Sequence, residues 1–350
     1  MNEAAPIATD QSSRVSWAAR MVRPLSDKGV GQRQPFLRKS FNLSSRGGAE
    51  TLRISALGLY RAFINGKRVG NDQMTPGWTS YWDRLSYQTY DVSGLLQDGV
   101  NVIDIWLGDG WYRSRMMWPR NEILNTWGSE IAAIAELRSG KGDVLVATDD
   151  TWTSGLTPIV KSGIYFGESY DARLEGEPAT SGSALVDYDL KRLIPHETHA
   201  VQELSELKPV KSFADSTGRM VYDFGQNAAG YVAITVEGKA GAKLVIEHAE
   251  LVDHTGQFDR ESMRSAEARV EYTLKGGGPE SYRPYFTFFG FRLARIAIEG
   301  EAKVVDIKSV PISTAVTQTA AFSSANPLVN RLVENTIWSQ RSNFVEVPTD

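Results

Sequence analysis

The dipeptide Asn65-Gly66 separates two apolar segments, at 60–64 and Val69. A two-residue type I′ turn needs positive φ at both central positions, which Asn followed by Gly accepts with little strain. The pair therefore predicts a tight antiparallel hairpin. Because the residues on both sides of such a turn must be extended, this part of the chain has to be built from short strands.

Neighbouring segments have the pattern of strands as well. Alternation of apolar and polar side chains is typical of a half-buried strand, and short apolar runs bounded by turn residues are typical of a buried one. The predicted strands lie at 52–56, 59–64, 102–107, 131–137 and 144–147. Short strands at this spacing predict a β-sandwich or jelly-roll domain, which we place at 35–176 after a leader at 1–34.

A second β-rich block follows a connector at 177–210 that contains Pro, Ser and Gly clusters. Its predicted strands lie at 231–236, 243–247, 268–274 and 293–298. Glycine-rich turns separate these strands, as in many all-β domains. We therefore predict a second β-sandwich at 211–312, in a mostly β protein with two tandem sandwich domains.

The pattern changes at Asn326-Pro327, where a capping residue precedes a proline suited to the first turn of a helix. Apolar residues from Leu328 to Ile337 then recur at helical spacing, which predicts an amphipathic helix of about four turns. A lone helix after two β domains has little to pack on. We therefore expect residues 313–350 to begin a further domain.

The composition excludes several classes of function. The 350 residues, of which 41% are hydrophobic and 23% charged, fit two or three globular domains. The formal net charge is -4 and no block of Lys and Arg stands out, so we expect no nucleic-acid partner. The absence of Cys excludes disulfides, thiolate metal sites and cysteine nucleophiles.

The N-terminal region has no apolar segment as long as a secretory signal or a membrane span. Residues 1–13 are polar, and the stretch 15–22 is short and interrupted by Arg20. We therefore expect a cytoplasmic protein with no membrane partner, and a periplasmic location stays open as the alternative. The sequence does not predict an oligomeric state.

Both β-rich blocks carry sequence motifs in a defined order. The first block holds YRAFINGKRVG at 60–70, TPGWTSY at 75–81, LGDGWYR at 107–113 and GESYDAR at 167–173. The second block holds DFGQNAAG at 223–230, HAE at 248–250 and PYFTFFGFR at 284–292, and the tail holds WSQRSNF at 338–344 and VPTD at 347–350. Together these motifs resemble the bacterial α-L-rhamnosidases of glycoside hydrolase family 78, over roughly residues 15–350.

This resemblance implies a domain order and an activity. The first block is similar to the family's N-terminal jelly roll, the second to its concanavalin-like sandwich, and 313–350 to the entry of its six-hairpin α/α barrel, which the chain would hold only in truncated form. The family removes terminal α-L-rhamnose from glycosides or oligosaccharides with inversion and needs no cofactor. Its general acid and general base are expected beyond residue 350, so we predict no catalytic residue in this chain and no activity from it alone.

Two pairs of carboxylates inside the chain were considered for the catalytic roles. Inversion uses two carboxyl groups about 6.5–9.5 Å apart, on opposite sides of the sugar. Glu247 and Glu250 are close in sequence, and so are Glu168 and Asp171. On a strand each pair would point to opposite faces of the sheet, so we expect surface or structural roles for all four.

Substrate contacts are predicted at Asp350, Trp111, Asp109, Tyr112 and Trp78. The resemblance matches Asp350 to the aspartate that opens the acidic run of the barrel and contacts rhamnose hydroxyls. The aromatic rings suit the C–H face of a pyranose, while Asp109 would accept hydrogen bonds from its hydroxyls. The alternative is that Trp111 belongs to the sandwich core and Asp109 to a turn.

The resemblance also bears on metals and on contacts between domains. Modules similar to the first block can bind rhamnose through calcium, so calcium is a candidate cofactor in the jelly-roll domain. The histidines have no acidic cluster around them at metal spacing, so we expect no zinc. Residues 223–227 combine turn formers with two amides and are predicted to form a polar lock between domains.

Two functions of different classes remain open. The first is that of the ancillary domains of an α-L-rhamnosidase, with rhamnose-containing glycosides or oligosaccharides as the partner. The second is that of a self-contained carbohydrate-binding sandwich protein without hydrolase activity. The helix and the VPTD segment that follow the second block favour the first.

Overall fold

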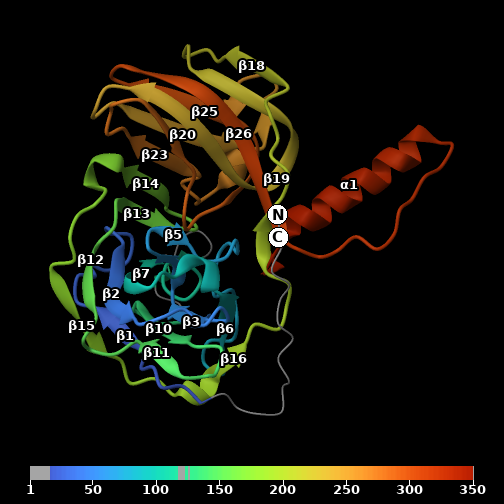
Figure 1. The fold of residues 1–350 in the computed structure, drawn as a ribbon. Helices are drawn as coiled ribbons and strands as arrows, with labels where there is room; N and C mark the ends of the chain where they lie inside the picture. The colour runs from blue at the N-terminus through green and yellow to red at the C-terminus, as the bar shows by residue number, and fades with distance from the viewer. Residues whose placement is uncertain (1–15, 117–122, 125–126, 350) are drawn as a thin grey trace. The chain divides into compact units, whose positions relative to one another are not determined.

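In the computed structural model, which describes residues 16–116, 123–124 and 127–349, the chain forms two compact units (Figure 1). Of the described residues, the first unit comprises 16–116, 123–124, 127–157 and 176–197, and the second comprises 158–175 and 198–349. Both units are built of strands, which confirms the predicted mostly β class.

The described strands of the first unit form a 12-stranded sheet in the order β16-β6-β3-β10-β1-β15-β12-β2-β7-β4-β5, with β11 paired to β10. Two further short strands, β8 and β9, pair with each other. Their bounds are β1 Val22–Pro24, β2 Pro35–Leu43, β3 Thr51–Leu57, β4 Leu59–Ile64, β5 Lys67–Arg68, β6 Leu85–Asp91, β7 Gly99–Gly108, β8 Arg115–Met116, β9 Ile123–Leu124, β10 Ala132–Arg138, β11 Val144–Ala147, β12 Thr153–Leu156, β15 Ser181–Leu185 and β16 Leu193–Pro195. Short 3-10 turns lie at Ser93–Leu95 and Leu190–Arg192.

The predicted hairpin is confirmed between β4 and β5. Asn65 and Gly66 have φ values of 52° and 75°, so both central residues adopt the left-handed conformation that a type I′ turn requires. Phe63 pairs with Arg68 and Ile64 with Lys67 across the turn. The local sequence alone therefore fixed this element.

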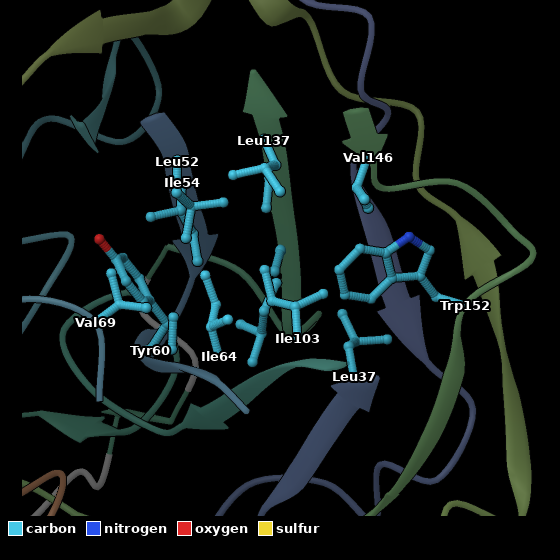
Figure 2. Packing of buried hydrophobic residues seen from close by; sticks show 14 of the residues in the cluster. Leu37, Leu52, Ile54, Tyr60, Ile64, Val69, Ile103, Leu137, Val146 and Trp152 are labelled. Carbon is cyan, nitrogen blue, oxygen red and sulfur yellow. The ribbon is translucent and has the colours of Figure 1, made fainter. Parts of the chain in front are cut away.

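The core of the first unit is enclosed because its sheet folds back on itself. Buried residues from β3 and β10, such as Ile54 and Leu137, share one cluster with Leu37 of β2 and Ile103 of β7, strands that are far apart in the pairing order. Figure 2 shows these side chains pointing toward one another, with Trp152 closing one end of the cluster. Two faces that bury their apolar side chains against each other are the basis of a sandwich.

The described strands of the second unit form a 10-stranded sheet in the order β13-β14-β23-β20-β25-β19-β26-β17, with β18 and β24 paired to β19. The pairs β21–β22 and β27–β28 are separate. The bounds are β13 Ile159–Gly163, β14 Gly167–Asp171, β17 Val201–Glu203, β18 Lys211–Ala214, β19 Met220–Gly238, β20 Lys243–Ala249, β21 Leu251–Val252, β22 Phe258–Asp259, β23 Arg269–Thr273, β24 Pro279–Tyr282, β25 Phe289–Glu299, β26 Ala302–Thr314, β27 Phe344–Val345 and β28 Val347–Pro348. Short 3-10 turns lie at Ala172–Leu174 and Glu261–Met263.

The predicted helix is present as α1, Pro327–Asn343. The Asn326 side chain accepts a hydrogen bond from the Leu328 backbone N–H, and Pro327 occupies the first turn, as the sequence indicated. No residue of α1 is buried, and Leu328 and Leu332 are 78% and 64% exposed. No helix among the described residues is long and apolar enough to cross a membrane.

The contacts divide the chain differently from the predicted boundaries at 176/177 and 210/211. Residues 158–175 belong to the second unit because β14 pairs in parallel with β23. Residues 176–197 belong to the first because β15 pairs with β1 and β12. Local composition gave no sign of either assignment, since both depend on pairing with strands far along the chain.

Candidate functional site

The aromatic side chains of the first unit gather around Trp78 and Tyr81, which lie between β5 and β6. The ring centroids of Trp78 and Trp111 are 6.1 Å apart, and those of Trp78 and Trp127 are 6.3 Å apart. Tyr81 contacts Tyr112 at 5.3 Å and Trp127 at 5.5 Å, with the rings edge to face in each case. The structure therefore brings together three predicted sugar-binding residues, Trp78, Trp111 and Tyr112.

One edge of this aromatic cluster reaches solvent at Trp82. Its side chain is 64% exposed, and its ring lies 4.5 Å from that of Trp127 at a tilt of 59°. By contrast, Trp111 and Tyr81 are buried. Trp127 was not among the residues predicted from the sequence. Its only signal there is that it is a Trp in a segment with several others, from Trp78 to Trp152. Trp118, in the same segment, lies outside the described residues.

Tyr112 connects the cluster to the segment after β15. Burial raises the pKa of its hydroxyl, and Arg192 opposes that shift. The Arg192 guanidinium lies 6.0 Å from the ring centroid of Tyr188, whose buried hydroxyl has no hydrogen-bond partner in the described part of the chain. The surroundings of the cluster therefore include a cation and a hydroxyl group, both of which suit a polyhydroxylated ligand.

Asp109 occupies a different environment from the one expected of a sugar ligand. Its side chain is fully buried, and Oδ1 accepts a hydrogen bond of 2.6 Å from Nε of Arg113, whose side chain is also buried. Oδ2 accepts from the Gly31 backbone N–H at 2.6 Å and from Gln34 at 3.4 Å. Burial raises the pKa of the Asp109 carboxyl, and the Arg113 guanidinium opposes that shift.

These contacts correct the expectation for Asp109, because both of its oxygens are engaged inside the fold. A sugar would have to displace Arg113 to reach it. Arg113 also binds Asp27, whose side chain is partly exposed, at 2.7 Å, so the three side chains form an ion cluster that holds the segment before β2 against the end of β7. The alternative prediction, in which Asp109 has a structural role in a turn, fits this geometry better than a sugar contact.

The four carboxylates considered for the catalytic roles all have hydrogen-bond or ion-pair partners within the second unit. Glu168 is buried and accepts hydrogen bonds from Tyr282, Ser162 and two backbone N–H groups. Asp171 instead caps the short turn that follows β14. Glu250 accepts a hydrogen bond from Asn227 at 3.0 Å.

Glu247 lies in a charged cluster on β20. It binds Arg295 at 2.7 Å, Arg260 at 2.9 Å and Arg219 at 3.5 Å, and Arg295 also binds Asp215 at 3.0 Å. Burial acts against ionisation of Asp215, but hydrogen bonds from Thr217, Arg219 and Arg295 lower the pKa of its carboxyl to about 2. These acids therefore stabilise the second unit as carboxylates.

Acid should weaken this unit in a defined pH range. The pKa of Asp215 is lower in the folded chain than its usual 3.8, so its contribution is complete above about pH 4 and is lost as the pH falls toward 2. We expect the stability difference between the wild type and Asp215→Asn, measured by urea unfolding with far-UV circular dichroism, to shrink over that range. The exposed Asp187→Asn serves as the control, and a difference independent of pH would contradict the prediction.

The segment predicted as a polar lock between domains has partners within the second unit. Asp223 binds Arg292 through two hydrogen bonds of 2.7 Å and accepts a third from the Gly225 backbone N–H. The pairing of β19 with β25 shifts register between Asp223 and Ala228, so the intervening residues bulge from the ladder. The role between domains stays a prediction.

No group of three or more His, Cys, Asp or Glu side chains among the described residues is arranged to hold a metal ion. His248 is fully buried between Phe289 and Phe291, and burial lowers the pKa of its imidazole to about 4. Calcium stays a candidate cofactor of the first unit. Asp350, the remaining predicted substrate contact, lies outside the described residues.

Three protein families match the chain in succession. The α-L-rhamnosidase N-terminal domain matches residues 48–206, the bacterial α-L-rhamnosidase concanavalin-like domain matches 214–313, and the bacterial α-L-rhamnosidase six-hairpin glycosidase domain matches 317–350. Among curated relatives, an α-L-rhamnosidase of Streptomyces avermitilis is 35% identical over 313 residues, which are 85% of this chain and 30% of the relative. One from Formosa agariphila is 31% identical, over 93% of this chain and 37% of the relative.

Solved structures show the same similarity. The chain is similar to native α-L-rhamnosidase from Aspergillus terreus with a TM-score of 0.87 and 32% identity, over 95% of this chain and 40% of that one. It is similar to the Streptomyces avermitilis α-L-rhamnosidase complexed with L-rhamnose with a TM-score of 0.85 and 33% identity, over 92% and 32%. The chain thus spans about a third of the length of the curated relatives named above.

Proposed function

Because this chain belongs to the bacterial α-L-rhamnosidase family and consists of its N-terminal domain, its concanavalin-like domain and the start of its six-hairpin domain, we propose that it serves in the hydrolysis of terminal α-L-rhamnosides. The observation that carries this proposal is the match of three rhamnosidase domains in succession. The described residues act as ancillary domains, and the substrates are rhamnose-containing glycosides or oligosaccharides.

The chemistry proposed for the whole protein is hydrolysis with inversion. One carboxylic acid protonates the leaving oxygen while a second carboxylate activates water on the other side of the sugar. The acids considered in the described chain do not fit this task. Glu168 is enclosed by hydrogen-bond donors, and Glu247 is neutralised by arginines. We therefore assign both catalytic carboxylates to the six-hairpin domain, in the part of it that lies outside residues 317–350.

Hydrolysis of an aryl α-L-rhamnoside tests this assignment. We expect no turnover by residues 1–350, and turnover by a protein extended through a complete six-hairpin domain. Proton NMR of the first sugar released should show the anomer of inverted configuration. Turnover by the 350-residue chain would contradict the placement of the acids, and an extended protein that cleaves other aryl glycosides but not the rhamnoside would contradict the substrate.

The exposed edge of the aromatic cluster supports a second function, carbohydrate binding by the first unit. The Trp82 ring is largely exposed and contacts the ring of Trp127. The C–H groups of a pyranose pack on exposed aromatic rings of this kind. Trp78 and Tyr112 would extend the contact. This function is compatible with either a hydrolase or a self-contained binding protein.

We expect Trp82→Ala to weaken the binding of L-rhamnose by the 350-residue chain about fivefold or more, because a stacking surface of this kind contributes about 1–3 kcal/mol. Isothermal titration at millimolar sugar, with and without calcium, measures the effect. Val100→Ala, which truncates another exposed apolar side chain of the same unit, should bind as the wild type does. Equal binding by the wild type and Trp82→Ala would remove the site from this surface.

A further inference from the structure

The hairpin β13–β14 belongs to one unit but is tethered to the other. Residues 157 and 176, which flank it, are both part of the first unit, whereas 158–175 are part of the second. β14 pairs in parallel with β23 from Glu168↔Val270 to Asp171↔Thr273. Since β23 is followed in the sheet by β20 and then β25, the hairpin covers what would otherwise be an open edge of the second unit.

A buried carboxylate holds this hairpin in place. Oε1 of Glu168 accepts hydrogen bonds of 2.8 Å from the Tyr282 hydroxyl and from the Tyr285 backbone N–H. Oε2 accepts from the Phe286 backbone N–H at 3.0 Å and from Ser162 on β13 at 3.0 Å. One side chain thus satisfies two backbone donors of the segment that leads into β25. Without it, the buried Phe286 N–H would lose this acceptor, which is costly.

Aromatic contacts of Tyr170, on the same strand β14, also hold the hairpin against the second unit. The Tyr170 ring lies 5.7 Å from that of Tyr272 and 5.8 Å from that of Tyr285, nearly parallel to both, and 5.1 Å from that of Tyr282. At the edge, Lys161 forms an ion pair of 2.6 Å with Glu267. The hairpin therefore contacts the second unit through its backbone, its core and its charged edge.

Gly167 sets the closest approach between hairpin and sheet. Its φ is +70°, and a Cβ atom there would overlap the carbonyl oxygen of Arg269. This oxygen belongs to the backbone of β23 and can move only if the strand moves. A side chain at Gly167 would therefore separate β14 from β23, whereas other left-handed glycines such as Gly218 (φ +78°) have no atom within 4 Å of the same position.

We propose that the second unit requires residues 158–175 in order to fold. We call this segment a donated hairpin, because the residues on both sides of it in the sequence belong to the first unit. Glu168 and Gly167 are its locking residues. The concanavalin-like segment is then incomplete as a folding unit at 214–313, and the stability of its sheet depends on a segment tethered at both ends to the other unit. The partner of the β23 edge is thus β14 of the same chain.

Hydrogen exchange of the full 350-residue chain tests the proposal. We expect Gly167→Ala to increase exchange at least tenfold in β14, β23 and β20, while β3 and β10 of the first unit change less than twofold. Gly218→Ala, which carries the same backbone strain in the same unit without the overlap, should leave β23 protected. An increase confined to β12 and β15 would show that the hairpin belongs to the first unit and would overturn the proposal, as would no change in β23.

A milder variant covers the case in which Gly167→Ala does not fold. Tyr282→Phe removes one donor to Glu168 and keeps the ring. We expect exchange in β14 and β23 to rise about threefold or more, with β3 and β10 unchanged. If Tyr282→Phe raises exchange equally in both units, or in neither, the hairpin does not act as a specific lock on the second unit.

Discussion

Replacement of Arg113 by alanine should lower the free energy of unfolding of the first unit by about 3–5 kcal/mol, since it leaves a buried carboxylate without its counter-ion. Arg113 and Asp109 are 1% and 0% exposed, and their contact is 2.6 Å long. Asp27 would lose its partner at the same time. Tryptophan fluorescence during urea unfolding measures the effect, because all described tryptophans except Trp338 lie in the first unit.

Two further variants separate charge from packing. In Asp109→Asn/Arg113→Met, the buried Asp109–Arg113 pair becomes neutral while its volume is largely kept, so most of the stability should return. Arg23→Ala breaks a pair with Glu130 in which both side chains are about half exposed, and should cost about 1 kcal/mol or less. If the double variant is as unstable as Arg113→Ala, an unpaired buried charge does not cause the loss and the electrostatic explanation is wrong.

Truncation of Trp152 to alanine should destabilise the same unit by about 3–5 kcal/mol, as expected when a large buried aromatic residue is removed. The side chain is 1% exposed and lies in the core shown in Figure 2, where it packs near Leu37 and Val146. Its indole N–H also donates to the Ala147 carbonyl at 2.9 Å. A cavity therefore forms, and a partly buried carbonyl loses its donor.

The matched comparison is Trp82→Ala in the same unit. Trp82 is 64% exposed, so its removal should change the urea midpoint little while it weakens sugar binding. Trp152→Ala should do the reverse at temperatures where the variant is folded. A loss below about 1 kcal/mol for Trp152→Ala would show that the core tolerates the cavity, which contradicts its assignment as a central packing residue.

The sequence by itself determined the elements whose cause is local. The Asn65-Gly66 turn, the strands with alternating or apolar patterns and the capped helix at Pro327 all follow from backbone preferences and side-chain periodicity within a few residues. The motifs in their order also indicated the family, and the three successive domain matches confirm it. For the candidate site, the aromatic types at Trp78 and Tyr112 indicated that rings gather there.

Only the tertiary structure decided which of these residues are accessible and which strands belong together. The sequence around Asp109 does not indicate that its side chain is buried, and the sequence around Trp82 does not indicate that its side chain is exposed. Burial depends on segments that are distant in sequence, such as the one around Gly31 that contacts Asp109. The same holds for β14, whose place beside β23 results from pairing across about 100 residues. The free energy of the whole packed unit determines which strands pair and which side chains are buried, and a short segment of sequence does not determine that free energy.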